Sequence, residues 1–134
     1  MPSSHAPHER GRLVIGMGID AVDVERFRRL LARRPKVAQR IFTDAERSFV
    51  SARLDPVPGL AARFAAKEAA MKALGTGLGG LRFAEVEVVG GQSGAPRLEV
   101  SGLAARRAEA LGVRNWHVSL THTDSVAAAV VVAD

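Results

Sequence analysis

The chain has 134 residues and carries 19 Lys and Arg against 14 Asp and Glu, so its formal net charge is +5. This length predicts one domain, and a hydrophobic content of 47% is enough to form a core. The absence of cysteine excludes disulfide scaffolds, thiolate zinc sites and thiol catalysis. No apolar run approaches the ~20 residues that cross a membrane. Aromatic residues make up only 4% of the chain, which leaves few platforms for stacking nucleic-acid bases.

The first twelve residues are polar and contain two prolines. We expect a disordered leader over residues 1–12 and a single folded domain over residues 13–134. The leader has no apolar segment of the kind that a signal peptide needs, so a cytoplasmic location is the default expectation.

The predicted elements begin with a strand. Residues 13–19 form a short apolar run with glycines, which favours a central strand that ends at Asp20. A helical pattern then begins at Asp23, which can act as its N-cap. Pro35 is expected to interrupt this helix.

Two further helices are predicted before the middle of the chain. Thr43 and Glu46 have the spacing of a capping box, which predicts a helix from about residue 44 to residue 52. Residues 55–59 are expected to form a loop. Residues 60–74 are rich in alanine and contain no helix breaker, so they form the strongest predicted helix.

The C-terminal half predicts mainly strands. A glycine-rich loop over residues 75–80 leads to a hairpin of strands 83–89 and 95–100. Ser101 caps a short helix that ends before Gly112, and two last strands follow at 115–121 and 126–133. The predicted fold class is therefore α+β, with one small, largely antiparallel sheet and helices packed on it. The last strand is apolar on both faces, so it is either buried or covered by a neighbouring subunit.

The positive charge is concentrated in one segment. Residues 23–40 hold seven cations and two anions, and their net charge of +5 equals that of the whole chain. Five of the cations are spaced to form a stripe on a continuous helix: Arg26, Arg29, Arg33, Lys36 and Arg40. The stripe is a solvated face, a docking surface for an acidic protein, or a nucleic-acid contact.

The 60–74 helix carries two charged pairs at helical spacing. Glu68 and Lys72 share one face, and Arg63 and Lys67 share another. Both pairs could be ordinary surface contacts. On a core helix, however, a carboxylate one turn from a lysine suits a magnesium–phosphate site, with Glu68 on the cation and Lys72 on a phosphate oxygen. Asp20 would supply a second carboxylate ligand.

The remaining candidate residues give weaker signals. The glycine loop at 75–80 follows a helix and lacks a following Lys-Ser or Lys-Thr, so it is neither a dinucleotide fingerprint nor a P-loop. Its backbone amides could still approach a phosphate or a pantetheine arm. His122 lies in a predicted strand turn, where a solvated or capping histidine is the commoner case.

Three blocks in this order resemble the holo-acyl-carrier-protein synthase family, the small phosphopantetheinyl transferases. The blocks are Gly-Ile-Asp at 18–20 with its acidic and basic helix, the segment from Arg63 to Gly77, and His-Val-Ser-Leu-Thr-His at 117–122. The segment at 41–46 also looks like the family's. Together the blocks cover about residues 13–133.

The resemblance implies transfer of 4′-phosphopantetheine from coenzyme A to a serine of apo acyl carrier protein, which releases adenosine 3′,5′-bisphosphate. It implies that Asp20 and Glu68 hold Mg²⁺ against the coenzyme A pyrophosphate. Glu68 and His122 are both candidates for the general base. Lys72 would stabilise phosphate charge. The remaining implied coenzyme A contacts are Arg63, Lys67, Gly75, Gly77, Ser119, Thr121 and His122.

The resemblance also implies partners and an assembly. The basic first helix would receive the acidic carrier protein through Arg26, with Arg29 and Arg33 beside it. The family forms homotrimers with sites between subunits, which fits the over-apolar last strand. Neither a membrane nor nucleic acid is an expected partner. Whether the carrier serves fatty-acid or polyketide synthesis stays open.

Two alternatives from other classes make different predictions. A basic nucleic-acid-binding module using residues 26–40 would bind DNA or RNA in a salt-sensitive way, without magnesium or coenzyme A. It leaves Asp20, Glu68 and Lys72 unexplained. A catalytically inactive scaffold of the same fold would not need both carboxylates.

Overall fold

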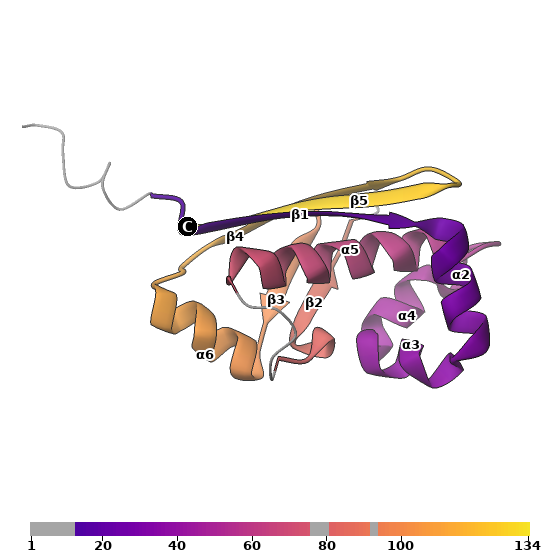
Figure 1. The fold of residues 1–134 in the computed structure, drawn as a ribbon, viewed down its shortest axis with the longest axis horizontal. Helices are drawn as coiled ribbons and strands as arrows, with labels where there is room; N and C mark the ends of the chain where they lie inside the picture. The colour runs from indigo at the N-terminus through magenta and orange to yellow at the C-terminus, as the bar shows by residue number, and fades with distance from the viewer. Residues whose placement is uncertain (1–12, 76–80, 92–93) are drawn as a thin grey trace, which may run out of the picture.

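The computed structural model describes residues 13–75, 81–91 and 94–134. Its elements confirm the α+β class, but the strands form two separate antiparallel sheets and not the single sheet that was predicted. The three-stranded sheet lies along helix α5 (Val57–Ala73), with α2, α3 and α4 at one end of that helix and α6 at the other (Figure 1). Helix α5 is thus the central element, and its N-terminal and C-terminal parts each belong to a hydrophobic cluster.

The larger sheet has the order β1-β5-β4, with all neighbours antiparallel. Its strands are β1 (Gly16–Asp23), β4 (Trp116–His122) and β5 (Val126–Ala133). The prediction that the first strand is central was wrong. The central position belongs to β5, whose apolar residues suit a strand with a neighbour on either side.

Three short helices follow β1. Helix α2 (Val24–Arg33) begins at Asp23, whose carboxylate accepts a hydrogen bond of 2.9 Å from the backbone N–H of Arg26. Pro35 then starts α3 (Pro35–Ile41), so the predicted interruption of the basic helix is confirmed. Helix α4 (Asp44–Ser51) begins with the predicted capping box of Thr43 and Glu46.

Helix α5 begins three residues earlier than predicted, at Val57, so the expected loop over 55–59 is too long. Pro58 is compatible with the first helical turn, where an N–H has no helical partner. Asp55 accepts a hydrogen bond of 3.1 Å from the backbone N–H of Val57 and so satisfies one free donor at this end.

The predicted hairpin is present as β2 (Val86–Val89) and β3 (Arg97–Val100), but residues Phe83–Glu85 form a 3₁₀ turn, labelled η2, and not strand. Helix α6 (Gly102–Leu111) follows. Ser101 occupies its N-cap position without the expected side-chain hydrogen bond. Glu85 instead accepts from the backbone N–H of Ala104 at 3.1 Å.

Strand β1 lies directly on α5. A Cβ atom added to Gly16 would lie 1.9 Å from the carbonyl oxygen of Ala73, so only glycine fits at this crossing. The close contact brings the first half of β1 over the C-terminal half of α5. It thereby places Asp20 beside the charged residues of that helix.

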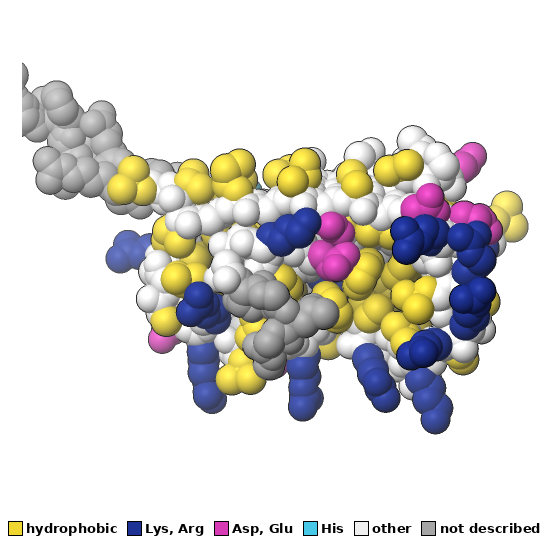
Figure 2. Space-filling view, viewed as in Figure 1, with side chains coloured by type: hydrophobic (Ala, Val, Ile, Leu, Met, Phe, Trp, Pro, Cys, Tyr) yellow, Lys and Arg dark blue, Asp and Glu magenta, His cyan; other side chains and the backbone are white. Residues whose placement is uncertain are grey.

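On β1 and β5 the opposite face of the three-stranded sheet is apolar, and it has no helix over it among the described elements. Met17 is 62% exposed and Ile19 is 68% exposed on β1, and Val130 of β5 is half-buried. Nonpolar side chains gather along this edge in Figure 2. Among the described residues, no helix is both long enough and apolar enough to cross a membrane.

Candidate functional site

Asp20, Glu68 and Lys72 meet where β1 crosses α5. The Lys72 ammonium donates to the carbonyl oxygen of Ile19 at 2.9 Å and to Oδ1 of Asp20 at 3.2 Å. Oδ2 of Asp20 is buried and receives no hydrogen bond from the described residues. Figure 2 shows acidic side chains beside a basic one on this face of the molecule, below the sheet. The three residues predicted from the sequence to share a site are therefore together.

The two carboxylates repel each other in a partly buried setting. Burial first, and then a hydrogen bond with Asp20 and the negative charge of that residue, raise the pKa of Glu68 from 4.5 to about 7, while Lys72 opposes the shift. Without a bound cation, Glu68 therefore takes up a proton more readily than an ordinary glutamate. A cation between the carboxylates would replace this proton and neutralise both charges.

The donor set fits a hard divalent cation. Magnesium is bound in proteins through one or two carboxylates, and it keeps water molecules or substrate phosphate oxygens in its other positions. Asp20 offers a buried oxygen with a free acceptor position, and Glu68 offers a second carboxylate. The described residues contain no cluster of three or more His, Cys, Asp or Glu side chains of the kind that an all-protein metal site needs.

Arg63 and Lys67 lie on a different side of α5 from Glu68 and Lys72. The expectation that these two residues form a surface contact was wrong, because Arg63 is 4% exposed and Lys67 is fully buried. Burial lowers the pKa of Lys67, and the carboxylate of Glu46 opposes that shift. Lys67 has no exposed surface with which to contact coenzyme A, which argues against its expected role as a ligand.

Arg63 packs beside the hairpin. One of its terminal nitrogens donates to the carbonyl oxygen of Gly90 at 3.0 Å, and its guanidinium lies 4.3 Å from the centre of the Phe49 ring. Its Nε is buried and has no hydrogen-bond acceptor among the described residues. Burial lowers the pKa of Arg63, although a guanidinium stays charged at any physiological pH.

Ser119, Thr121 and His122 are not near the acidic pair within one chain. All three are exposed on β4, and β5 separates that strand from β1. The side chains of Ser119 and Thr121 alternate with inward-facing Leu120, so they lie on the outer face of the sheet. Two strand spacings, about 10 Å, therefore separate β4 from the strand that carries Asp20.

The predicted glycine loop lies mostly outside the described residues. Gly75 has a φ of 71°, and its N–H donates to the carbonyl oxygen of Lys72, which is the geometry expected after a helix C-terminus. A side chain at Gly75 would meet no atom within 4 Å. Gly77 falls in the segment 76–80 that the structure does not describe.

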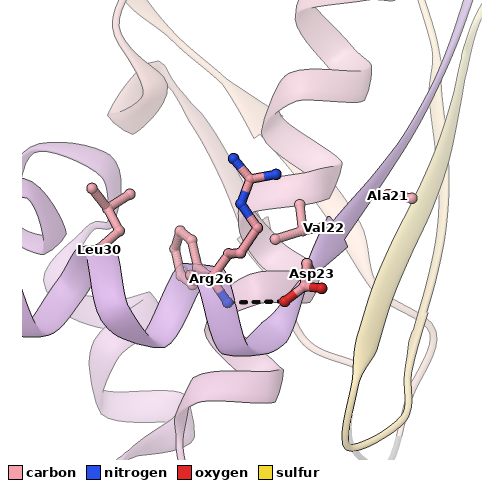
Figure 3. Close-up of a pocket in the computed structure, with 6 residues that line it drawn as sticks. Ala21, Val22, Asp23, Arg26 and Leu30 are labelled. Carbon is pink, nitrogen blue, oxygen red and sulfur yellow. Dashed lines mark hydrogen bonds between the residues drawn. The ribbon is translucent and has the colours of Figure 1, made fainter.

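The basic helix presents an open groove. Arg26 borders a hollow of about 310 Å³ together with Asp23, Phe27 and Leu30 (Figure 3). A second hollow of about 600 Å³ is lined by residues of the same helix and its end: Arg26, Arg29, Leu30, Arg33 and Arg34. Basic side chains cluster over α2 in Figure 2.

Two ion pairs that no sequence signal indicated are present in the structure. Arg28, on α2, binds Asp55 through two hydrogen bonds of 3.0 and 2.7 Å, so its charge is already compensated. Glu46 pairs with Lys67 in the interior at 2.8 Å. Neither partner is close in sequence, and no spacing signal pointed to these contacts.

Comparison with known proteins identifies the class. A family model described as the 4′-phosphopantetheinyl transferase superfamily matches residues 16–131. The holo-[acyl-carrier-protein] synthase of Streptomyces griseus is 51% identical over 122 residues, which cover 91% of this chain and 99% of that protein. The chain therefore belongs to the 4′-phosphopantetheinyl transferase superfamily, and within it to the holo-[acyl-carrier-protein] synthase family.

Solved structures of the same family have this fold. The holo-[acyl-carrier-protein] synthase of Neisseria meningitidis superimposes with a TM-score of 0.81 at 31% identity, covering 91% of this chain and 99% of that one. The holo-(acyl-carrier-protein) synthase of Bacillus anthracis, in complex with CoA (3′,5′-ADP), has a TM-score of 0.74 at 32% identity, covering 91% and 97% of the two chains.

Proposed function

We propose that this protein transfers the 4′-phosphopantetheine group of coenzyme A to a serine hydroxyl of an apo acyl carrier protein. Family membership and the coenzyme A complex of the B. anthracis relative support this activity. The observation that carries the proposal is the cluster of Asp20, Glu68 and Lys72, because it combines a free buried carboxylate oxygen with a neighbouring ammonium. Because the matching proteins are transferases, they argue against the alternative of a nucleic-acid-binding module.

Asp20 and Glu68 would hold Mg²⁺ in this proposal. A magnesium ion bound there supplies a Lewis acid that neutralises charge on the pyrophosphate of coenzyme A. Lys72 is more than half exposed and is tied to β1 by two hydrogen bonds, so its ammonium is held at the edge of the acidic pair. From that position it would bind a phosphate oxygen and stabilise the charge that develops on the leaving group.

The chemical step needs an acceptor for one proton. The serine oxygen forms a bond to the phosphorus next to pantetheine, the phosphoanhydride bond breaks, and adenosine 3′,5′-bisphosphate leaves with the bond's electrons. Glu68 lies in the cluster beside Asp20, so it fits the proton acceptor by its position. His122 would reach an acidic pair only from a neighbouring copy of the chain.

Arg63 stays a candidate for a coenzyme A phosphate. Its buried Nε without an acceptor supports this role, since an anion would satisfy that donor. The role would require a ligand beside the Gly90 end of the hairpin, away from the acidic pair. Gly75, Gly77, Ser119 and Thr121 remain proposed cleft residues.

The basic face of α2 is the proposed docking site for the carrier protein. Arg26, Arg29 and Arg33 are exposed, whereas Arg28 on the same helix is held by Asp55. The groove beside Arg26 also exposes part of Leu30, so it offers both charge and apolar contact to an acidic helix.

We also propose a homotrimer. The apolar outer face of the three-stranded sheet supports an assembly, because a monomer would leave Met17 and Ile19 in water. Contact through this face would carry Ser119, Thr121 and His122 of one copy toward the acidic pair of another. This arrangement would reunite the site residues that a single chain keeps apart.

The test uses the full chain with coenzyme A, MgCl₂ and a purified apo acyl carrier protein. Mass spectrometry of the intact carrier is expected to show the gain of one phosphopantetheine group, and EDTA is expected to abolish it. A Glu68→Gln variant should be inactive although it is folded by circular dichroism. Transfer at the wild-type rate in that variant would overturn the metal assignment.

A further inference from the structure

The interior of the protein contains an ion pair that the reaction does not use. Glu46 of α4 and Lys67 of α5 are both buried, and their charged groups lie 2.8 Å apart. Charges are seldom kept in a protein core, because removing them from water is costly unless every polar atom finds a partner. Packing alone therefore does not explain why this ion pair is present in the core.

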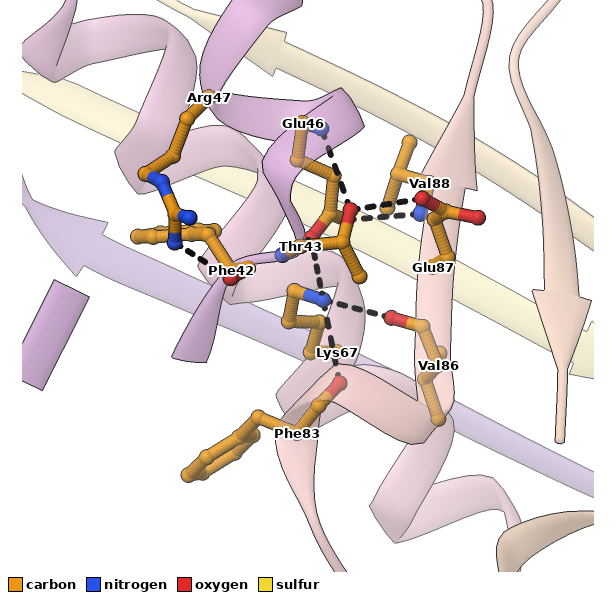
Figure 4. Close-up of polar contacts among 9 residues, drawn as sticks. All are labelled: Phe42, Thr43, Glu46, Arg47, Lys67, Phe83, Val86, Glu87 and Val88. Atoms are coloured by element: carbon orange, nitrogen blue, oxygen red, sulfur yellow. Dashed lines mark hydrogen bonds and ion pairs between the residues drawn. The ribbon is translucent and has the colours of Figure 1, made fainter. Parts of the chain in front are cut away.

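All three donors of Lys67 and both carboxylate oxygens of Glu46 have hydrogen-bond partners (Figure 4). The Lys67 ammonium donates to Glu46, to the carbonyl oxygen of Phe83 at 3.1 Å and to that of Val86 at 2.7 Å. The Glu46 carboxylate accepts from the backbone N–H of Thr43 at 2.9 Å and from that of Val88 at 2.8 Å. Three separate parts of the fold, α4, α5 and the hairpin with its preceding turn, are thus joined at one point.

Helix α5 needs a contact that fixes its orientation, because its buried surface is formed mainly by small side chains of similar shape. Its buried positions are dominated by alanines: Ala61, Ala62, Ala65, Ala66, Ala69, Ala70 and Ala73. Small, uniform side chains interlock weakly, so they define the rotation of a helix about its axis less well than large ones do. Lys67 is the longest of the fully buried side chains on this helix.

Rotation of α5 matters for catalysis because Glu68 follows Lys67 directly. A roll of about 20° would move a carboxylate roughly 6 Å from the helix axis by about 2 Å. A misplacement of about 1 Å in an active site can lower a rate by roughly 100-fold. The position of Glu68 against Asp20 thus depends on what prevents α5 from rolling.

We propose that Lys67 and Glu46 are positioning residues, which fix the rotation of α5 and so hold Glu68 and Lys72 in register with Asp20. Lys67 does not contact the substrate. It acts through the backbone of residues 83–88 and through Glu46, which together form a socket for its ammonium. This inference rests on the proposed transferase function.

The test is a double substitution, Glu46→Gln with Lys67→Met. Lys67→Met alone leaves a buried carboxylate without its partner and is expected to unfold the chain. The double variant removes both charges, and the glutamine keeps an oxygen for a backbone N–H. We expect it to be folded by circular dichroism and to lose at least about tenfold in kcat, with the KM values for coenzyme A and carrier protein changed less than about threefold.

A stability-matched control separates positioning from general destabilisation. Leu98→Ala removes a buried side chain of β3 without touching the ion pair. It should lower the melting temperature at least as much as the double variant and leave kcat within about twofold of wild type. If Leu98→Ala loses kcat to the same extent, loss of stability explains the effect and the positioning role is wrong.

A single Glu46→Gln substitution separates positioning from ligand binding. It leaves Lys67 in the chain, so a direct contact with coenzyme A would persist. Because burial already lowers the pKa of Lys67, the lysine can lose its proton in this variant and avoid an unpaired buried charge. We expect kcat to fall as in the double variant. An unchanged kcat in Glu46→Gln, with a raised KM for coenzyme A in the double variant, would overturn the proposal. Absence of transfer by the wild-type protein would instead count against the proposed function.

Discussion

Gly18 of β1 lies against the backbone of Ala69 in α5, and a Cβ atom at this glycine would stand 1.8 Å from the Ala69 carbonyl oxygen. The overlap is with backbone, so no side-chain rotation can relieve it. Gly18 is two residues from Asp20, and Ala69 follows Glu68 directly. The glycine therefore sets the distance between the two strongest candidate metal ligands.

Gly18→Ala is expected to force β1 away from α5. We expect the substitution to reduce the free energy of unfolding by about 3 kcal/mol and to reduce transfer activity well beyond that loss of folded protein. Chemical denaturation and kinetics normalised to folded protein measure the two effects. Gly94→Ala is the matched control, since no atom lies within 4 Å of a Cβ there, and it should change neither quantity.

The raised pKa of Glu68 predicts that cation binding competes with a proton. A pKa of about 7 means that a cation must displace a proton below this pH but not above it. Lowering the pH from 8 to 6 should therefore raise the Mg²⁺ concentration needed for half-maximal activity by about tenfold. An identical Mg²⁺ requirement at both pH values would contradict the assignment of Glu68 as the ligand that titrates.

Glu68→Gln is expected to stabilise the cation-free protein while abolishing transfer. The folded pKa of Glu68 is raised above its unfolded value of 4.5, so folded protein holds the proton that unfolded protein releases between pH 4.5 and 7. Its contribution to stability is thus greatest below pH 4.5 and falls as the pH rises to 7. Glutamine does not titrate.

The gain in melting temperature from Glu68→Gln should therefore be small at pH 4.5 and larger at pH 8, where it corresponds to about 1 kcal/mol after allowance for solvent screening. Thermal unfolding in EDTA at both pH values measures it. Glu109→Gln, on exposed α6, is the control and should show no such pH-dependent gain. A destabilised Glu68→Gln at pH 8 would show that the two carboxylates do not repel each other.

The contacts of Glu46 show which interactions could be predicted from the sequence and which could not. Thr43 and Glu46 are three residues apart, and their reciprocal hydrogen bonds depend only on local geometry, so the pattern predicted them correctly. The bond from Glu46 to Lys67 joins residues 21 positions apart, and nothing in either segment indicates it. Local rules fix the start of α4 but not the contacts made by its side chains.

Lys67 and Glu68 illustrate the same limit within one helix. They are adjacent in sequence, but a helix turns by about 100° per residue, so they face different neighbours. One is fully buried, and the other lies at the acidic site. Because α5 is apolar around much of its circumference, the sequence did not indicate which charged side chains would be buried.

Reversal of charge on α2 tests the carrier-docking surface. Arg26→Glu with Arg29→Glu should raise the KM for the carrier protein by about tenfold and leave the KM for coenzyme A nearly unchanged, since rim charges mainly govern encounter. Arg106→Glu with Arg114→Glu makes the same change in net charge at exposed positions outside α2 and should have little effect. Equal changes in both KM values would argue against docking on α2.

The outer sheet face predicts the oligomeric state. Met17 is 62% exposed on that face, so a buried charge placed there should prevent an assembly that covers it. We expect Met17→Glu to convert a trimer into monomers, as measured by size-exclusion chromatography with light scattering. Transfer activity should fall with the assembly, because Ser119, Thr121 and His122 would no longer be supplied by a neighbouring copy.

Leu103→Glu provides the matched control for this change, since Leu103 is an apolar residue of α6 that is 47% exposed away from the sheet. It should leave both the assembly and the activity intact. The two readouts are linked by the geometry of the sheet. Strand β5 separates Asp20 on β1 from the polar residues of β4, so a monomer of this fold holds only part of the proposed site. A monomeric Met17→Glu variant with full activity would show that one chain contains a complete site, and it would remove Ser119, Thr121 and His122 from the catalytic cleft.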